Sequence, residues 1–197
     1  MSKGERTREQ VVEQAAALFN QRGYHGASIS LLMQATGLQK GGIYRHFASK
    51  EALAVAAFRF ATDRLGERFA EALAEQTTAL GKLRAIASVF ARIPVDPPVP
   101  GGCPMLNAAV DSDDGNPELR DEAQRTMNEL RKLLRSIVRS GQKTGELGPG
   151  ADPEAVANVL VAQLEGSVLL CQLLGSQAPM KHTLEHLESW FEQLARR

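Results

Sequence analysis

The segment from residue 39 to residue 50 gathers side chains that can contact a nucleic acid. Two lysines can neutralise phosphate groups, a tyrosine hydroxyl can donate to one, and an arginine can read a guanine. Two adjacent glycines cost a short helix about 1 kcal/mol each against alanine, so they indicate a surface kept bare for close approach. The residues on this surface are Gln39, Lys40, Gly41, Gly42, Tyr44, Arg45, His46 and Lys50. They favour a helix that enters the major groove of DNA, although a helical hairpin with a solvated polar face fits the same residues.

A helix, a tight turn and a second short helix must position these side chains. Ser28 can cap the first helix, and Gly37 ends it. On the second helix, Ile43 and Phe47 are four residues apart and therefore share one face, which can form a small core with Leu32. This core would turn the polar side chains outward.

The charge of the chain is divided unevenly. Residues 1–50 carry seven bases and three acids, a net charge of +4, whereas the whole chain is neutral, so the remainder carries −4. A basic head on an acidic body is typical of a protein that contacts phosphate at one end, although chance unevenness in a helical protein gives the same sum.

The chain as a whole reads as all-α, with about nine helices and no stretch that alternates with the period of a strand. Thr7 and Gln10 have the spacing of a capping box, and Asn116 and Asp152 are each followed by a proline that suits the first turn of a helix. We expect a helix-turn-helix domain over residues 1–50 and a helical effector-binding and dimerisation domain over residues 51–197. The helix after Lys50 has no break and would be shared by both.

Residues 37–53, Gly-Leu-Gln-Lys-Gly-Gly-Ile-Tyr-Arg-His-Phe-Ala-Ser-Lys-Glu-Ala-Leu, resemble the signature of the TetR family of bacterial regulators. The resemblance implies a repressor that a small ligand releases from a palindromic operator. It places Arg45 where the family varies, which suits a residue that sets sequence preference. Gly42 stands where the family usually has threonine. The positions that it implies near DNA are Ser28, Ser30, Gln39, Lys40, Gly41, Tyr44 and His46, with Lys50 on a phosphate.

The resemblance also implies a homodimer that forms through the last two long helices. The helix over residues 152–174 is apolar nearly all round, and the last helix carries an apolar stripe, so both need cover, although both could be plain core. The candidate dimerisation residues are Val156, Leu160, Leu164, Leu184, Leu187, Phe191 and Leu194.

The sequence says less about the chemical class of the small-molecule effector than about the DNA-binding segment. No group in the body demands a charged ligand, so we expect an apolar or aromatic compound, although methionines and aromatics at helical spacing are more often core than ligand site. The candidate effector-binding residues are Phe69, Phe90, Cys103, Met105, Met127, Leu130 and Gln163.

Two alternatives remain on the same fold. One is a DNA-binding protein without a ligand, in an architectural or nucleoid role. The other is a regulator triggered by electrophile or redox modification of Cys103, whose segment 101–107 resembles one seen in electrophile-sensing subgroups of the family; a small buried residue that closes a turn is the simpler interpretation.

Neither an enzyme nor a membrane protein is expected. No nucleophile–base pair, phosphate loop or metal cluster stands out, so we expect no catalysis, cofactor or metal. Uninterrupted apolar runs, such as residues 168–171, are far shorter than the roughly 18–20 residues that span a bilayer. Cys103 and Cys171 form no disulfide framework, which favours the cytoplasm.

Overall fold

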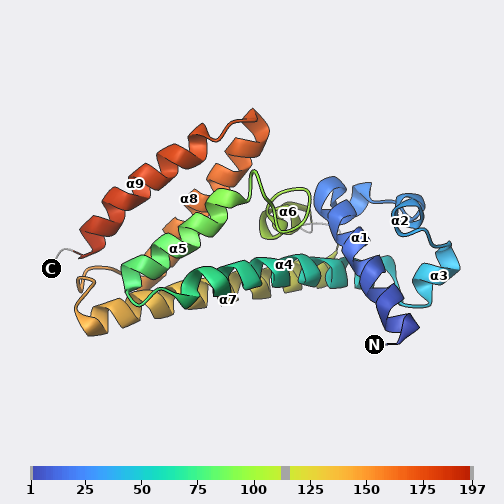
Figure 1. Cartoon of the computed structure of the whole chain (residues 1–197), viewed down its shortest axis with the longest axis horizontal. Helices are drawn as coiled ribbons and strands as arrows, with labels where there is room; N and C mark the ends of the chain where they lie inside the picture. The colour runs from blue at the N-terminus through green and yellow to red at the C-terminus, as the bar shows by residue number, and fades with distance from the viewer. Residues whose placement is uncertain (1, 112–115, 196–197) are drawn as a thin grey trace. The chain divides into compact units, whose positions relative to one another are not determined.

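The computed structural model describes residues 2–111 and 116–195, and every regular element in these ranges is an α-helix. Nine helices lie there, which confirms the all-α prediction (Figure 1). In chain order they are α1 (Lys3–Gly26), α2 (Ile29–Thr36), α3 (Lys40–Tyr44), α4 (Lys50–Ala74), α5 (Ala79–Arg92), α6 (Pro104–Asp111), α7 (Pro117–Thr144), α8 (Pro153–Leu174) and α9 (Ala178–Ala195).

Side-chain caps begin the later helices where the sequence predicts them. The Asn116 side chain accepts from the backbone N–H of Leu119 at the start of α7, at 3.1 Å. The Asp152 carboxylate accepts from Glu154 at the start of α8, also at 3.1 Å. Each side chain satisfies one of the N–H groups that a first helical turn leaves without a partner.

The start of the first helix was predicted wrongly. Helix α1 begins at Lys3, four residues before Thr7, and its capping box is formed by Ser2 and Glu5. Thr7 lies inside the helix, where its hydroxyl donates to the Lys3 carbonyl at 3.0 Å. Both pairs have capping-box spacing, and the earlier pair adds one more turn of helix.

Contacts between residues divide the chain into two compact units. The first comprises Met1–Leu65 and Pro97–Thr126, and the second comprises Gly66–Asp96 and Met127–Arg197. Helices α4 and α7 each contribute residues to both units. The division into a domain over residues 1–50 and another over 51–197 follows sequence order instead, and it stays a prediction.

The first unit contains α1, α2, α3, α6 and the first parts of α4 and α7. Its main core is made by α1 and α4 together with the two helices of the predicted helix-turn-helix and one residue of the segment before α6. The buried residues of this core are Val11, Val12, Ala15, Ala16, Leu32, Ile43, Phe47, Leu53, Ala57, Ala61 and Val99.

The second unit contains α5, α8, α9 and the remaining parts of α4 and α7. Helices α8 and α9 are joined by a short turn at Gly175 and lie side by side, and α5 packs against both (Figure 1). Phe90 on α5, Leu164 on α8 and Phe191 on α9 are fully buried in this arrangement. The described part of the unit therefore has its own apolar core.

By length and composition alone, α8 could cross a membrane. Its most apolar 18-residue window has a mean hydropathy of 1.5, and 44% of that window is buried inside the protein. One such helix is weak evidence for a membrane segment, because a core helix passes the same test. The packing of α8 against α5 and α9 accounts for the buried side of this apolar helix.

Candidate nucleic-acid interface

Helices α2 and α3 form a helix-turn-helix. Ser28 caps α2, with its hydroxyl accepting from the Leu31 N–H at 3.3 Å. Gly37 ends α2 in the left-handed conformation, with φ of 68°, a geometry that glycine adopts without a steric cost. Ile43 on α3 is 1% exposed and packs into the core of the first unit. The turn and this anchor fix the orientation of the short α3.

Most predicted DNA contacts lie on the surface of this motif. Gly41 is exposed, and a Cβ built there would meet nothing within 4 Å, so no packing in the described part of the chain demands glycine at this position. A Cβ at the half-buried Gly42 would lie 3.4 Å from the Leu38 Cβ, so this glycine partly faces the α2–α3 turn. Ser28, Ser30, Gln39, Lys40 and Arg45 are exposed, and Tyr44 and His46 are half-buried.

Lys50, the first residue of α4, is held in place by Tyr24. Its ammonium donates to the Tyr24 carbonyl at 2.5 Å and lies over the Tyr24 ring, 4.3 Å from the centroid. Burial lowers the pKa of Lys50, while the charges of Glu51 and Asp111 raise it. One of the three donors of this lysine is thus used inside the protein, which leaves two for a phosphate.

In the described ranges, the bases of the helix-turn-helix region form no ion pairs with carboxylates. Within the part of the chain that the structure describes, none of the seven Lys and Arg residues of positions 1–50 forms an ion pair. Elsewhere in the same unit, Arg59 and Arg125 both pair with Glu122, and Arg64 pairs with Glu13. The positive charge of these unpaired bases can attract a polyanion such as DNA.

Sequence reasoning missed the residues that support this surface from behind. The guanidinium carbon of Arg8 on α1 lies 5.0 Å from the centroid of the ring of Phe47, a residue that follows α3 in the chain. The Asp111 carboxylate accepts from the backbone N–H of Tyr24. Tyr24 and Asp111 are 87 residues apart, and no local pattern marks such a pair.

The seven candidate effector residues do not form one set. Cys103 and Met105 lie in the first unit and are fully buried, whereas the other five lie in the second. Of those five, Phe69 and Phe90 contact each other, with ring centroids 5.7 Å apart. The Gln163 Oε1 atom is buried without a hydrogen-bond partner. No group of three His, Cys, Asp or Glu residues in the described ranges could hold a metal ion.

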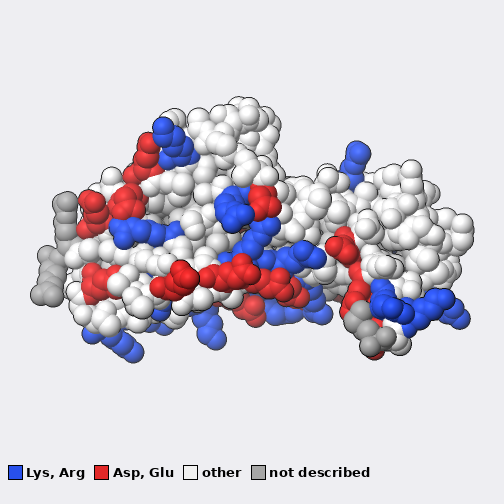
Figure 2. All heavy atoms as spheres, viewed as in Figure 1, with Lys and Arg blue, Asp and Glu red and all other residues white. Residues whose placement is uncertain are grey.

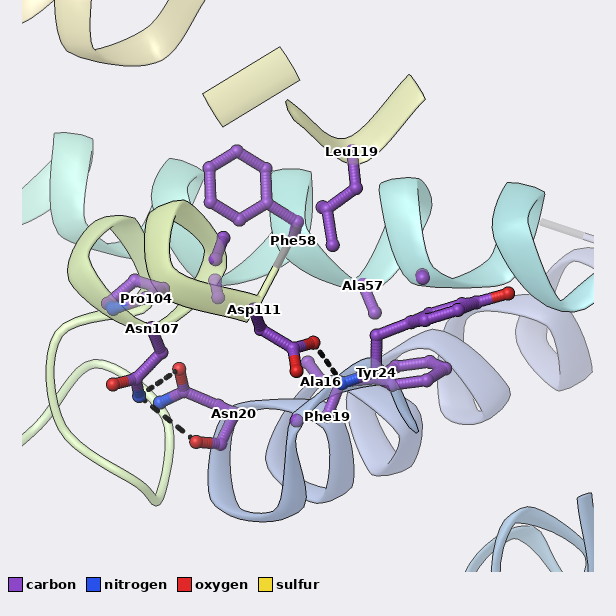
Figure 3. Close-up of a pocket in the computed structure, with 14 residues that line it drawn as sticks. Ala16, Phe19, Asn20, Tyr24, Ala57, Phe58, Pro104, Asn107, Asp111 and Leu119 are labelled. Atoms are coloured by element: carbon purple, nitrogen blue, oxygen red, sulfur yellow. Dashed lines mark hydrogen bonds between the residues drawn. The ribbon is translucent and has the colours of Figure 1, made fainter. Parts of the chain in front are cut away.

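A small cavity lies inside the first unit, among α1, α4, α6 and the start of α7 (Figure 3). Its volume is about 40 Å³, room for one or two water molecules. Asn20, Asn107 and Asp111 supply its polar wall, and Phe19 and Phe58 are among its apolar lining. None of the seven candidate effector residues lines it.

The candidate dimerisation residues mostly face the core of their own chain. Val156, Leu160, Leu164, Leu187 and Phe191 are buried by its other helices and offer little surface to a second chain. Leu184 and Leu194 are half-buried.

A different face of α8 is exposed. Its large apolar residues include Leu173, which is 75% exposed, and the turn from α8 to α9 carries no charged side chain (Figure 2). The exposed large apolar residues of α8 are Val159, Leu169, Leu170, Leu173 and Leu174.

Comparisons with known proteins identify both parts of the chain. The family model described as bacterial regulatory proteins of the tetR family matches residues 11–57. The model described as the C-terminal domain of tetracyclin repressor-like proteins matches residues 79–187, more than half of the chain.

Individual relatives agree along the whole length. A TetR transcriptional regulator from Chloroflexus aurantiacus J-10-FL is 45% identical, with a TM-score of 0.95 over 100% of this chain and 99% of that one. A TetR-family regulator from Cytophaga hutchinsonii is 30% identical, with a TM-score of 0.90 over 100% and 98%. The HTH-type transcriptional repressor DhaR of Mycobacterium sp. (strain GP1) is 25% identical over 90% of this chain and 88% of its own. The chain belongs to the TetR family of bacterial transcriptional regulators, a family of DNA-binding repressors in which a response to a small ligand is typical.

Proposed function

We propose that this protein is a homodimeric repressor that binds a palindromic operator and is released from it by a small apolar or aromatic ligand. The observation that carries the proposal is the exposed face of α3, where the flanking bases Lys40 and Arg45 form no ion pair in the described part of the chain. Such a face suits phosphate and base-edge contacts in a major groove. Such a regulator would act in the cytoplasm and would need no catalytic site.

The proposed contacts divide by chemistry. Lys40 and Lys50 neutralise phosphates, and the Tyr44 hydroxyl donates to one. Arg45 reads a base edge, since an exposed guanidinium can bond a guanine in a bidentate manner. The remaining contacts lie near the backbone or the groove floor and are Ser28, Ser30, Gln39, Gly41, Gly42 and His46.

For the dimer, the exposed face of α8 is a better contact than the residues chosen from the sequence. Val159, Leu169 and Leu173 follow helical spacing on one side of α8, which also carries small residues at 155, 162 and 166. A second copy of this chain can cover such a face, because small residues let two helices approach closely. Two heads would then read two half-sites of a palindrome.

A charge placed on this face tests the dimer. Leu173→Glu should produce monomers at micromolar concentration in analytical ultracentrifugation, because the new carboxylate would be buried without a partner. Glu192→Gln on the exposed side of α9 is the control and should stay dimeric. A Leu173→Glu protein that stays dimeric would exclude this face.

The two alternatives gain no support. Family membership favours a ligand-responsive regulator over an architectural protein. Cys103 is 0% exposed, so an electrophile would reach its thiol only after the surrounding segment had opened. Burial therefore favours the structural role of a small residue that closes a turn.

Selection of bound duplexes from a random library tests the regulator directly. We expect enrichment of an inverted repeat, and at moderate salt we expect the enriched duplex to bind far more tightly than random DNA. Equal affinity for both would contradict sequence-specific repression. A subsequent thermal-shift screen of apolar and aromatic compounds should find ligands that raise the melting temperature and release the duplex.

A further inference from the structure

Tyr24 is held from three sides at the point where α1 gives way to the helix-turn-helix. Its backbone N–H donates to the Asp111 carboxylate, and its hydroxyl donates to Glu51. Its carbonyl accepts from the Lys50 ammonium at 2.5 Å. Tyr24 is buried, so these contacts fix the residue on which Lys50 rests.

The backbone at this point needs an acceptor from elsewhere in the chain. Gly23 breaks the helical conformation of α1, with φ of 72° and ψ of 169°. A Cβ at Gly23 would lie 2.7 Å from Asp111 Oδ1, so the absence of a side chain makes room for the carboxylate. A buried N–H without an acceptor costs about 1–3 kcal/mol, and Asp111 supplies that acceptor for Tyr24.

Asp111 is itself held against α1, because a second polar contact docks α6 one turn earlier. The Asn107 amide donates to the Asn20 carbonyl at 3.0 Å and to Asn20 Oδ1 at 2.9 Å. It also donates to the Gly101 carbonyl at 2.8 Å. Figure 3 shows Asn107 and Asp111 on α6 pointing toward Asn20 and Tyr24 on α1.

We infer that Asp111 is a positioning residue for DNA binding: by fixing Tyr24 it holds the Lys50 ammonium at the start of α4, where that group meets a phosphate. The inference rests on the proposed function, and it assigns a role in DNA binding to a residue outside the segment 11–57 that the N-terminal family model matches. Asp111 contacts no DNA in this scheme. It acts through the Tyr24 backbone.

The direction in which DNA affinity changes when the Asp111 carboxylate is removed distinguishes a positioning role from electrostatic repulsion of DNA. Removing a carboxylate near DNA should tighten binding, because it reduces repulsion of the phosphates. Asp111→Ala should instead weaken binding about tenfold, since Lys50 loses its fixed position. It should also make the slope of log affinity against log salt shallower by about 1.8 per dimer, because one phosphate contact is lost in each chain.

The experiment compares variants of the full-length protein on the duplex that the wild type selects from a random library. Asp111→Asn keeps a side-chain oxygen that can accept from Tyr24, so it should bind as the wild type does. Asp121→Ala removes an exposed carboxylate from the same unit and should not weaken binding. In a Lys50→Gln background, Asp111→Ala should cause no further loss. Circular dichroism establishes that each variant is folded, and Asp111→Leu, which also lacks an acceptor, replaces Asp111→Ala if the latter is not.

The outcomes are distinct. Wild-type affinity and slope in a folded Asp111→Ala protein would overturn the inference, as would an equal loss in Asp111→Asn or a full further loss in the Lys50→Gln background. A wild-type protein that selects no duplex would overturn the proposed function instead.

Discussion

Replacing Gly101 by alanine tests how the segment before α6 is docked on α1. Gly101 has a φ of 115°, which residues with a side chain rarely adopt. A Cβ there would lie 2.5 Å from the Asn20 carbonyl oxygen and 2.9 Å from the Gln21 nitrogen. Both are backbone atoms of α1, so they cannot rotate away as the end of a side chain could.

The cost follows from two contributions. An alanine in this conformation is strained by roughly 1–3 kcal/mol. Relief of the clash requires the segment to move away from α1, which breaks hydrogen bonds of the Asn20 amide to the Pro100 carbonyl at 3.1 Å and to the Gly102 carbonyl at 3.2 Å. Each such bond contributes about 0.5–1.5 kcal/mol. Gly101→Ala should therefore reduce the free energy of unfolding by about 2–6 kcal/mol.

Urea unfolding followed by circular dichroism measures this loss. Gly150→Ala is the matched control, because a Cβ at Gly150 would meet nothing within 4 Å and its φ is not in the unfavourable range. That variant should change stability by less than about 0.5 kcal/mol. A Gly101→Ala protein within 1 kcal/mol of the wild type would refute the reasoning, since it would mean that the segment can shift at almost no cost.

Two further predictions concern charge. Lys40→Gln should make the slope of log affinity against log salt shallower by about 1.8 per dimer, because one phosphate contact is lost in each chain. Fluorescence anisotropy with a labelled duplex measures this slope. As a control, Lys132→Gln removes an exposed base of α7 in the second unit and should leave the slope unchanged. The hydrogen bond from Arg59 holds the pKa of Glu122 below its ordinary 4.5, so ionised Glu122 stabilises the fold above that pH. Glu122→Gln should cost about 1 kcal/mol at pH 7 in urea unfolding, and the difference from the wild type should disappear as the pH falls through the lowered pKa; a cost that persists at pH 2 would point to packing instead.

Local signals in the sequence were enough to predict most of the helices and the helix-turn-helix. The caps at Ser28 and Asp152 and the left-handed Gly37 depend on residues within three positions of each other, so their chemistry can be read along the chain. The same reasoning failed at Thr7, because two overlapping pairs had the spacing of a capping box and the spacing alone could not choose between them.

The sequence was less informative about which apolar faces of a helix are covered. Helix α8 is apolar nearly all round, and the side that carries Leu160 and Leu164 is buried by its own chain while the side that carries Leu169 and Leu173 is exposed. Periodicity reports that a face is apolar, and it does not report which neighbour covers it. For the same reason the candidate effector residues were distributed between two units.

By itself, then, the sequence determined an all-helical regulator with a basic helix-turn-helix, because caps, turns and recognition side chains act over a few residues. Only the tertiary structure decided which distant residues fix the position of that helix-turn-helix. Asp111 accepts from Tyr24 across 87 residues of sequence, and Asn107 reaches back to Asn20 over the same separation. Contacts of this kind arise when packing brings distant backbone groups together, and a buried N–H then takes whichever acceptor the fold places beside it.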